Sequence, residues 1–323
     1  MTEIGVVLPT RVGLGAVPPD TLLEIAEAVD RTDGWSHIWV TDSIISLPFY
    51  DSTVLLAAAA ARTSRVRLGV ACQASLGLRH PLIAAQQWAN LDALSGGRMT
   101  LIACPGEATG PTRVKELRAF GMSHAEKVRQ MEETIEFLRT VSRGGSVSFA
   151  GRHFSIDDLE LAPAFVQQPF PIWMTGNPPE DASEELVARV LSRVARLGDG
   201  WLTFAVTPEV LAARTDTLSG LRVSAGRSPD GEFPVVVFLN VNVNPVGEQA
   251  VTDATAAWRS QSTRNVSSDD LKKVAAIGSP EEVADFIGRL SDAGATAIAV
   301  NLLSSDHRTQ LDMISEYLLP LVA

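Results

Sequence analysis

Two carboxylates follow apolar, strand-like runs in the first third of the chain. Asp42 comes directly after HIWVT (37–41), and Glu107 lies three residues past RMTLIAC (98–104), in a loop that also holds Gly106. A carboxyl group at such a place can donate or accept a proton, and a glycine beside it lets backbone N–H groups approach a ligand closely. Position alone leaves the plainer alternatives open: Glu107 as a solvated loop residue, and Asp42 as a group that satisfies the backbone of its own loop.

The two cysteines, Cys72 and Cys104, end neighbouring strand-like runs at the same level. Two cysteines are too few for a disulfide framework, and no further Cys or His stands at the spacing that a zinc site requires. We interpret both as small apolar wall residues, with nucleophilic or redox chemistry as the alternative. No metal site is predicted, and the chain has neither an H-E-x-x-H helix nor a G-x-x-x-x-G-K-[ST] loop.

The composition is typical of a soluble globular protein. The 323 residues are 46% hydrophobic and 20% charged, and the net charge of −11 argues against a nucleic-acid-binding surface, which must neutralise phosphates. The longest apolar stretch, TVLLAAAAA (53–61), is too short to span a membrane, and the start MTEIGVVLPTR lacks the pattern of a secretion signal. We therefore expect a cytoplasmic protein whose partners are small molecules or other subunits.

Short runs rich in Val, Ile, Leu and Thr alternate with longer stretches of helical period from one terminus to the other, which predicts parallel strands joined by crossover helices. The strand candidates are IGVVLP (4–9), HIWVT (37–41), VRLGVAC (66–72), RMTLIAC (98–104), FPIWMT (170–175), GWLTF (200–204), FPVVVFLNV (233–241) and TAIAVNL (296–302). Eight such units predict a closed (β/α)₈ TIM barrel. An open doubly wound sheet is the alternative, although no G-x-G-x-x-G follows the first strand.

Two stretches exceed the minimal repeat. VSFAGRHFSIDDLELAP (147–163) alternates apolar and polar residues about a central Ala-Gly, which predicts an inserted hairpin. The polar segment 244–278 lies between the seventh strand and its helix, where long loops often form lids or binding loops. We expect one domain over 1–323, a TIM barrel with an inserted hairpin and extended βα loops.

Several motifs carry a family likeness. The longest is ARTSRVRLGVACQASLGLRHPLIAAQQWANLDALSGGRMTLIACPGE (61–107), and the others are HIWVTDS, VSFAGRHFSI, FPIWMTGN, RLGDGWL and IGSPEEVADFIGRLSDAGATAIAV. In this order and over nearly the whole length, the chain resembles the bacterial luciferase-like flavin and deazaflavin oxidoreductases. The resemblance implies a (β/α)₈ barrel with an insertion that binds reduced FMN or the deazaflavin coenzyme F-420 at the strand ends.

Carried over position by position, the resemblance implies a set of site residues. Asp42 is expected to contact the cofactor ring, and Ala71-Cys72 to form a bulge, often held by a non-prolyl cis peptide in the family, that supports the ring from behind. Glu107 matches the acid of a Gly-Glu-Ala loop near the hydride-transfer centre. The full expectation is Glu107 and Asp42 as catalytic residues, and Asp42, Ser43, Ala71, Cys72, Pro105, Glu107, Thr175, Gly176 and Asn177 as cofactor-binding residues, the last three meeting the cofactor tail and phosphate.

The chain also departs from the family pattern. Ser43 stands where many relatives have His, and Thr109 follows Gly-Glu-Ala where Asn is common. The leading hypothesis is an oxidoreductase that moves a hydride between coenzyme F-420 and a small organic substrate. The alternatives are a two-component monooxygenase that takes reduced FMN from a separate flavin reductase, and a barrel that binds flavin without turnover. An F-420 reductase is a possible partner of the first, and a homodimer is expected by analogy.

Overall fold

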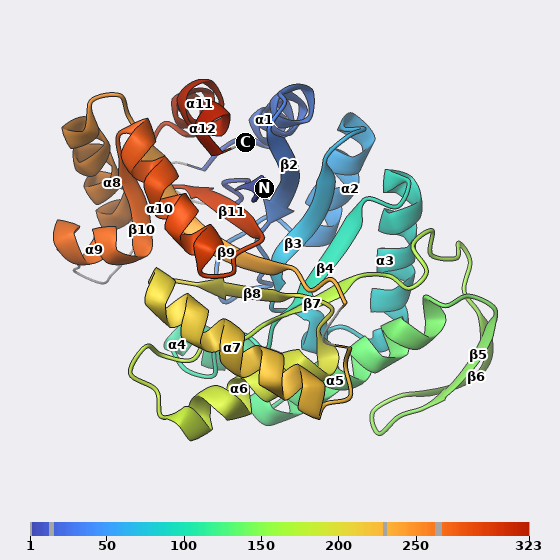
Figure 1. The fold of residues 1–323 in the computed structure, drawn as a ribbon. Helices are drawn as coiled ribbons and strands as arrows, with labels where there is room; N and C mark the ends of the chain where they lie inside the picture. The colour runs from blue at the N-terminus through green and yellow to red at the C-terminus, as the bar shows by residue number, and fades with distance from the viewer. Residues whose placement is uncertain (1, 13–15, 229–230, 262–266, 323) are drawn as a thin grey trace.

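In the computed structural model, which describes residues 2–12, 16–228, 231–261 and 267–322, eight parallel strands close into a barrel (Figure 1). These strands are β1 (Glu3–Val7), β2 (Trp35–Val40), β3 (Arg67–Gln73), β4 (Met99–Ala103), β7 (Ile172–Thr175), β8 (Trp201–Phe204), β9 (Val235–Val243) and β11 (Ala297–Leu302). Pairing of β8 with β9 closes the ring, with Trp201 opposite Val235 and Phe204 opposite Phe238. The predicted closed barrel is confirmed, and the open-sheet alternative is excluded.

Helices cover the outside of the barrel, as the alternating pattern predicts (Figure 1). They are α1 (Pro19–Arg31), α2 (Ser52–Arg62), α3 (Pro81–Ser95), α5 (His124–Val141), α6 (Glu184–Leu197), α7 (Pro208–Ser224), α10 (Pro280–Asp292) and α11 (His307–Met313), the last continuing through a π-helical turn (Ile314–Leu318) into α12 (Leu319–Val322). A short helix that the sequence analysis did not predict, α4 (Pro111–Ala119), lies in the loop after β4. It brings two charged residues, described below, to the site.

The two long insertions differ in how well they were predicted. The hairpin is confirmed as β5 (Ser146–Ala150) and β6 (Ser155–Glu160), which pair antiparallel and project from the barrel (Figure 1). The prediction of a long loop over 244–278 is wrong: the segment forms α8 (Gly247–Gln261), α9 (Ser268–Val274) and an extra strand β10 (Ala275–Gly278) beside β9. Part of it, 262–266, lies outside the described residues.

Alanines explain why this segment folds as helix. Ala250, Ala254 and Ala257 recur on one face of α8 and are buried together with Leu271 and Ile277. Alanine has the highest helix propensity and still buries a small apolar face, so a stretch that reads as polar can pack as an amphipathic helix.

Side chains fill the inside of the barrel. A cluster of buried residues separate from the outer core consists of Val7, Trp39, Ala71, Ile102, Trp173, Leu202, Val236, Ala297 and Ala299. Trp39 and Trp173 lie at its centre, with ring centroids 5.9 Å apart. A Cβ at Gly69 would lie 2.5 Å from a carbon of the Trp39 ring, so the strand needs glycine there to make room for the indole. The interior is therefore a packed plug beneath the mouth, as in other barrels of this type.

His37 lies beside this plug and is 2% exposed. Its ring stacks on Trp39 with centroids 5.0 Å apart, and Nε2 has no hydrogen-bond partner within the described residues. Burial, with a smaller contribution from Arg67, lowers the pKa of His37 to about 3. The imidazole is therefore neutral at physiological pH, and its 3.8 Å approach to the Glu3 carboxylate is not an ion pair there.

This buried histidine predicts acid sensitivity. The unfolded chain takes up a proton on His37 near pH 6.5, whereas the folded protein does so only near pH 3, so stability falls as the pH drops between these values. From about pH 7.5 to about pH 5 this one group should remove about 2 kcal/mol of the free energy of unfolding. Urea unfolding at both pH values, for the wild type and His37→Gln, measures the effect. The variant should lose distinctly less stability than the wild type, and equal losses would contradict the prediction.

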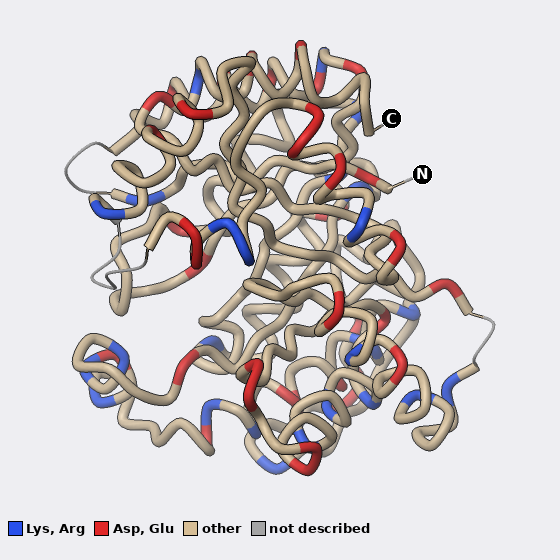
Figure 2. Tube along the Cα trace, turned by 60° about the vertical axis from the view of Figure 1, so that its left-hand side comes forward, with Lys and Arg blue, Asp and Glu red and all other residues tan. Residues whose placement is uncertain are grey.

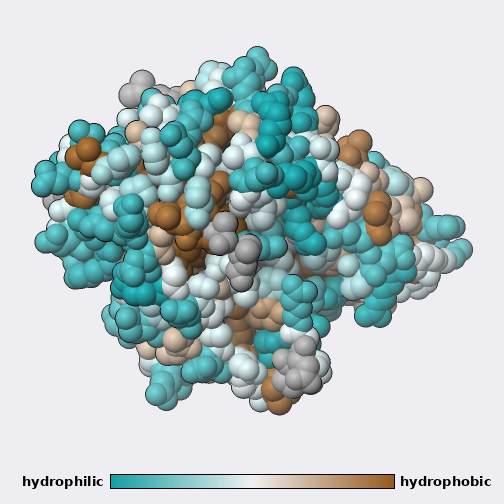
Figure 3. Space-filling view, turned by 45° about the horizontal axis from the view of Figure 1, so that its top comes forward, coloured by the Kyte–Doolittle hydropathy of each residue, from teal (hydrophilic) through white to brown (hydrophobic). Residues whose placement is uncertain are grey.

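Charges are spread over the outside of the molecule. Figure 2 shows acidic and basic residues interspersed along the outer helices and loops, without a basic face. Figure 3 shows one face on which apolar side chains gather in a hollow, surrounded by hydrophilic ones. No helix within the described residues combines the length and the apolar character needed to cross a membrane.

Candidate functional site

Asp42 follows β2 at the mouth of the barrel, but its side chain is only 1% exposed. Oδ1 accepts a hydrogen bond from the Ser52 hydroxyl (2.7 Å), and Oδ2 accepts one from the Ser75 backbone N–H (2.8 Å). Arg79 lies 3.9 Å from Oδ1. The carboxylate thus joins the start of α2 to the loop after β3, and its geometry is that of a group that positions the neighbouring backbone.

Ser43 is likewise engaged within its own loop. Its Oγ accepts a hydrogen bond from the Leu47 backbone N–H (2.9 Å) and shares one with the Ser46 hydroxyl (2.8 Å). Glu116 of α4 supports the same loop from outside, since its Oε1 accepts hydrogen bonds from the backbone N–H groups of Ile45 and Ser46. The loop after β2 is therefore held on both sides by buried polar contacts.

Glu107 lies at the rim with its side chain 68% exposed. Arg113 of α4 donates a hydrogen bond to Glu107 Oε2 at 3.1 Å and a second to the Ser46 hydroxyl at 2.8 Å. The guanidinium thereby ties the acid to the loop after β2. Pro105, half-buried, precedes Gly106, whose φ of 69° falls in the left-handed region that favours glycine. The acid is held over the mouth and remains open to solvent and to a ligand.

The expected bulge at the end of β3 is present. The peptide between Ala71 and Cys72 is cis, and the pairing of β3 with β4 shifts by one residue there. The interpretation of the two cysteines as separate wall residues is wrong, because Cys72 and Cys104 form a disulfide, with their Cα atoms 5.8 Å apart. Two cysteines that end neighbouring parallel strands come within bonding range once one of them occupies a bulge.

Thr175, Gly176 and Asn177 follow β7. Gly176 is buried against α6, where a Cβ would lie 2.7 Å from Val194. The side-chain oxygen Oδ1 of Asn177 accepts a hydrogen bond from the Thr203 hydroxyl (2.6 Å), and the side-chain nitrogen Nδ2 has no partner within the described residues. Because α6 begins only at Glu184 with two acids in its first turn, the helix end is unsuited to a phosphate. The side-chain amide of Asn177 is therefore the hydrogen-bond donor that this segment offers to a ligand.

Lys127 of α5 was not predicted as a site residue. It is 4% exposed, and a Cβ on Gly106 would lie 2.9 Å from its Nζ. Burial lowers its pKa, Glu116 and Asp42 act in the opposite direction, and Arg113 adds to the lowering. Within the described residues the ammonium makes no hydrogen bond and no ion pair at 4.0 Å or less. The side chain is buried as a whole, but its Nζ is not among the sealed atoms without a partner, so an amine without an acceptor beside the loop of the rim carboxylate is suited to bind an acceptor atom of a ligand.

The sequence did carry a signal for this lysine. Met131, Thr134 and Leu138 follow Lys127 at spacings of four, seven and eleven residues, which places all four on one face of the helix. All four are buried. A lysine on the apolar face of a helix indicates an amine that points inward.

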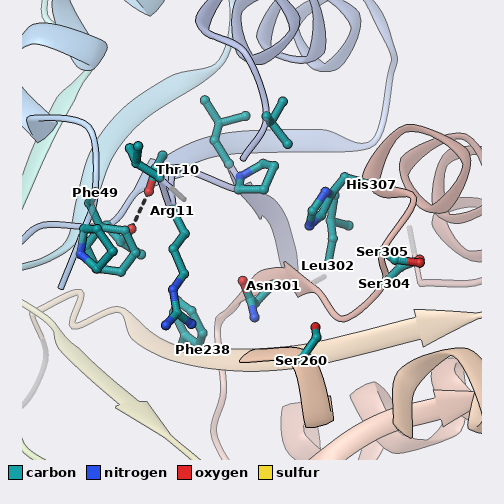
Figure 4. Close-up of a pocket in the computed structure, with 16 residues that line it drawn as sticks. Thr10, Arg11, Phe49, Phe238, Ser260, Asn301, Leu302, Ser304, Ser305 and His307 are labelled. Carbon is teal, nitrogen blue, oxygen red and sulfur yellow. Dashed lines mark hydrogen bonds between the residues drawn. The ribbon is translucent and has the colours of Figure 1, made fainter. Parts of the chain in front are cut away.

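A cavity of about 580 Å³ opens at the ends of β1, β2 and β11 and beside Phe238 in the middle of β9 (Figure 4). Its apolar walls include Phe49 and Phe238, and its polar groups are Thr10, Arg11, Thr41, Ser260, Asn301, Ser304, Ser305 and His307. None of these residues was predicted. The rule that reacting groups gather at strand ends, applied to the first and eighth strands, would have found Thr10, Arg11 and Asn301.

The cavity and the predicted residues lie on two sides of one loop. Thr41, Pro48 and Phe49 line the cavity, while Asp42 and Ser43 between them are buried on the other side. Ala71, Cys72, Pro105, Glu107, Thr175, Gly176 and Asn177 do not line it. The mouth therefore has two parts: the predicted residues and Lys127 on the β2–β3–β4–β7–β8 side, and the cavity on the β9–β11–β1–β2 side.

The donor set on the first side fits a flavin or deazaflavin, whose ring carbonyls and phosphate are acceptors. The Lys127 ammonium and the Asn177 side-chain amide are both unpaired donors within the described residues, and the backbone bulge at Ala71-Cys72 lies at the end of β3 on the same side of the mouth. A ligand rich in hydrogen-bond acceptors can bond to such donors, whereas an apolar ligand leaves them unsatisfied.

A family model described as luciferase-like monooxygenase matches residues 2–297. The chain belongs to this family. A protein of Mycobacterium tuberculosis is 29% identical over 228 residues, which cover 70% of this chain and 73% of the relative. Membership of the luciferase-like family makes the chain an oxidoreductase.

Two solved structures agree in fold with this luciferase-like protein. The monooxygenase RslO1 from Streptomyces bottropensis has a TM-score of 0.80 and 21% identity, covering 99% of this chain and 100% of that one. An F420-dependent secondary alcohol dehydrogenase in complex with an F420-acetone adduct has a TM-score of 0.80 and 19% identity, covering 100% and 99%. These likenesses show the shared barrel, which serves an oxygenase in one case and a dehydrogenase in the other.

Proposed function

We propose that the protein transfers a hydride between coenzyme F-420 and a small organic substrate. The observation that carries the proposal is Glu107, held over the mouth by Arg113 and next to the Gly106 loop against which the Lys127 amine lies. Such a transfer requires a proton to be given to or taken from the substrate oxygen, and a rim carboxyl group open to the ligand can do this. When bound, the deazaflavin supplies the hydride-accepting or hydride-donating carbon and reacts poorly with oxygen.

The residues of this site have distinct roles in the proposal. Lys127 and Asn177 bind acceptor atoms of the cofactor, and the bulge at Ala71-Cys72 supports the ring from behind. Asp42 acts as a positioning residue, because its buried oxygens fix the Ser75 backbone that follows the bulge. Glu107 holds or moves the proton. The protein works as a homodimer, for which the support is family analogy alone.

A second candidate is a two-component monooxygenase that takes reduced FMN from a separate reductase. It is supported by the luciferase-like monooxygenase family model and by the similarity in fold to the monooxygenase RslO1. The donors Lys127 and Asn177 serve either cofactor, so they do not discriminate between the two candidates.

Cofactor titration tests the proposal. The purified protein is titrated with F-420 and with FMN, each oxidised and reduced, under anaerobic conditions for the reduced forms, and any co-purified cofactor is identified by mass spectrometry. Saturable binding of F-420 supports the proposal. Tight binding of reduced FMN without affinity for F-420 overturns it in favour of the monooxygenase, and binding of neither leaves a barrel without this cofactor chemistry.

Lys127→Met should weaken binding of the cofactor by about tenfold, because a charge-assisted hydrogen bond to a buried acceptor contributes about 1.5 kcal/mol or more. Methionine keeps the length of the apolar stem and removes the ammonium group with its charge and its donors, so the free energy of unfolding should change by less than about 1 kcal/mol. The dissociation constant, measured by fluorescence titration, checks the prediction. Lys115→Met, on the exposed side of α4, is the matched control and should leave affinity unchanged.

A further inference from the structure

The cavity on the β9–β11–β1–β2 side of the mouth has an unusual distribution of charged side chains. Among the described residues that line it, Arg11 is the one side chain with a permanent charge, and no Asp, Glu or Lys lines it. Burial lowers the pKa of His307, against the opposing effects of Asp306 and Asp253, so that ring is neutral near pH 7. A cavity with a cation and no carboxylate stands out in a protein whose net charge is −11.

The polar groups of the cavity are partly occupied by one another. Thr10 and Thr41 share a hydrogen bond between their hydroxyl groups, and the Asn301 amide donates to Asn240 Oδ1 at 2.7 Å. The Ser304 hydroxyl donates to Asp253 Oδ2 at 2.6 Å. These contacts hold the walls in place.

His307 is different. Its ring is half-buried and lines the cavity, yet neither ring nitrogen makes a hydrogen bond within the described part of the chain. Figure 4 shows Arg11 and His307 reaching into the cavity from either side of Asn301, with Phe238 beneath Arg11. A neutral imidazole can donate one hydrogen bond and accept another. The cavity therefore presents a cation at one place and an unsatisfied neutral donor and acceptor at another.

From this geometry we propose that the cavity binds an organic anion: a carboxylate on Arg11, carried by a flat apolar or aromatic body that packs beside Phe49 and Phe238. A hydroxyl or carbonyl group at the far end of the body bonds to His307. A cavity of about 580 Å³ is of the size that holds a small organic molecule. The bidentate guanidinium suits a carboxylate, and the aromatic side chains supply the buried area. Binding of the anion does not depend on the proposed function. Its assignment as the substrate does, and the anion then has to extend past the loop after β2 to meet Glu107, which does not line the cavity.

The test measures binding to the full chain without added cofactor, by isothermal titration calorimetry with benzoate and its neutral analogue benzamide. The wild type should bind benzoate at least about tenfold more tightly than benzamide, because only the carboxylate pairs with Arg11. Arg11→Gln should remove this preference, and Arg11→Lys should restore part of it, since the charge returns without the planar fork. Raising salt from about 50 mM to about 500 mM should weaken benzoate binding and leave benzamide binding unchanged.

Two controls keep the outcome clear. Arg152→Gln removes an exposed arginine of the hairpin, outside the cavity lining, and should bind benzoate as the wild type does. Thermal unfolding of Arg11→Gln shows that the variant is folded, and its retained affinity for benzamide shows that the cavity is intact. Equal affinity of the wild type for the two probes, a preference that survives Arg11→Gln, or no binding of benzoate at all overturns the proposal.

A second probe tests the far end of the cavity. The wild type should bind 4-hydroxybenzoate more tightly than benzoate, and His307→Phe should abolish this gain while keeping the preference for benzoate over benzamide. A gain that persists in His307→Phe overturns the role given to His307. If neither F-420 nor FMN binds but benzoate does, the anion site stands and only its assignment as the substrate site falls.

Discussion

Glu107→Gln should lower turnover by about a hundredfold or more, the usual contribution of a general acid or base, and should change cofactor affinity by less than about threefold. Glutamine keeps the shape of the side chain and can still accept a hydrogen bond from Arg113, but it cannot exchange a proton. Because Glu107 is 68% exposed, its ion pair with Arg113 contributes little to folding, and the variant should unfold as the wild type does. The measurement is the steady-state rate of F-420 oxidation or reduction with a substrate that the wild type converts.

The matched control is Glu160→Gln, an exposed acid on the hairpin strand β6. It makes the same chemical change away from the mouth and should have wild-type kinetics. Unchanged turnover in Glu107→Gln would return this acid to the role of a solvated loop residue. A loss of affinity that accounts for the whole effect would assign it to cofactor binding and not to proton transfer.

Asp42→Ala should lower the free energy of unfolding by about 3 kcal/mol and abolish measurable cofactor binding. The change leaves the Ser75 N–H and the Ser52 hydroxyl without their acceptor, and it removes a buried negative charge close to Arg79 and Lys127. The loop after the bulge then loses the contact that fixes it. Urea unfolding and fluorescence titration of the same preparation check both parts.

Asp51→Ala is a demanding comparison, because Asp51 is the other carboxylate that Arg79 contacts and it also caps α2. Its side chain is 45% exposed, so the expected cost is about 1 kcal/mol, that of a lost N-cap, with cofactor binding retained. If Asp42→Ala and Asp51→Ala lower the free energy of unfolding equally, the burial of Asp42 does not increase its contribution to stability. If Asp42→Ala binds cofactor normally, the positioning role is contradicted.

The barrel could be predicted because its strands are buried on both faces. Runs such as VVVFL in β9 are continuous in Val, Leu and Phe, and that pattern has few interpretations besides a parallel strand. Helix α8 escaped prediction because its buried face consists of alanines, which add little to hydrophobic periodicity. The pairing of Cys72 with Cys104 escaped as well, since it depends on a one-residue bulge whose effect on side-chain direction is visible only in three dimensions.

The site could be predicted in outline only. Strand-end position and family likeness indicated Asp42 and Glu107, but neither criterion distinguishes a buried carboxylate that holds backbone from an exposed one at the rim. That distinction depends on α4, which contributes Arg113 and Glu116 and was absent from the predicted elements. Lys127 lies still farther along the chain, and only the packing of α5 brings its amine to Gly106.

The packed interior around Trp39 and Trp173 has a kinetic consequence. With its floor filled by side chains, the barrel is a cup with one opening, and two ligands that react with each other must pass the same rim. Because the two parts of the mouth lie side by side above this floor, each ligand can occupy its own part while the other part is empty. Steady-state analysis should therefore give the pattern of a random order of addition.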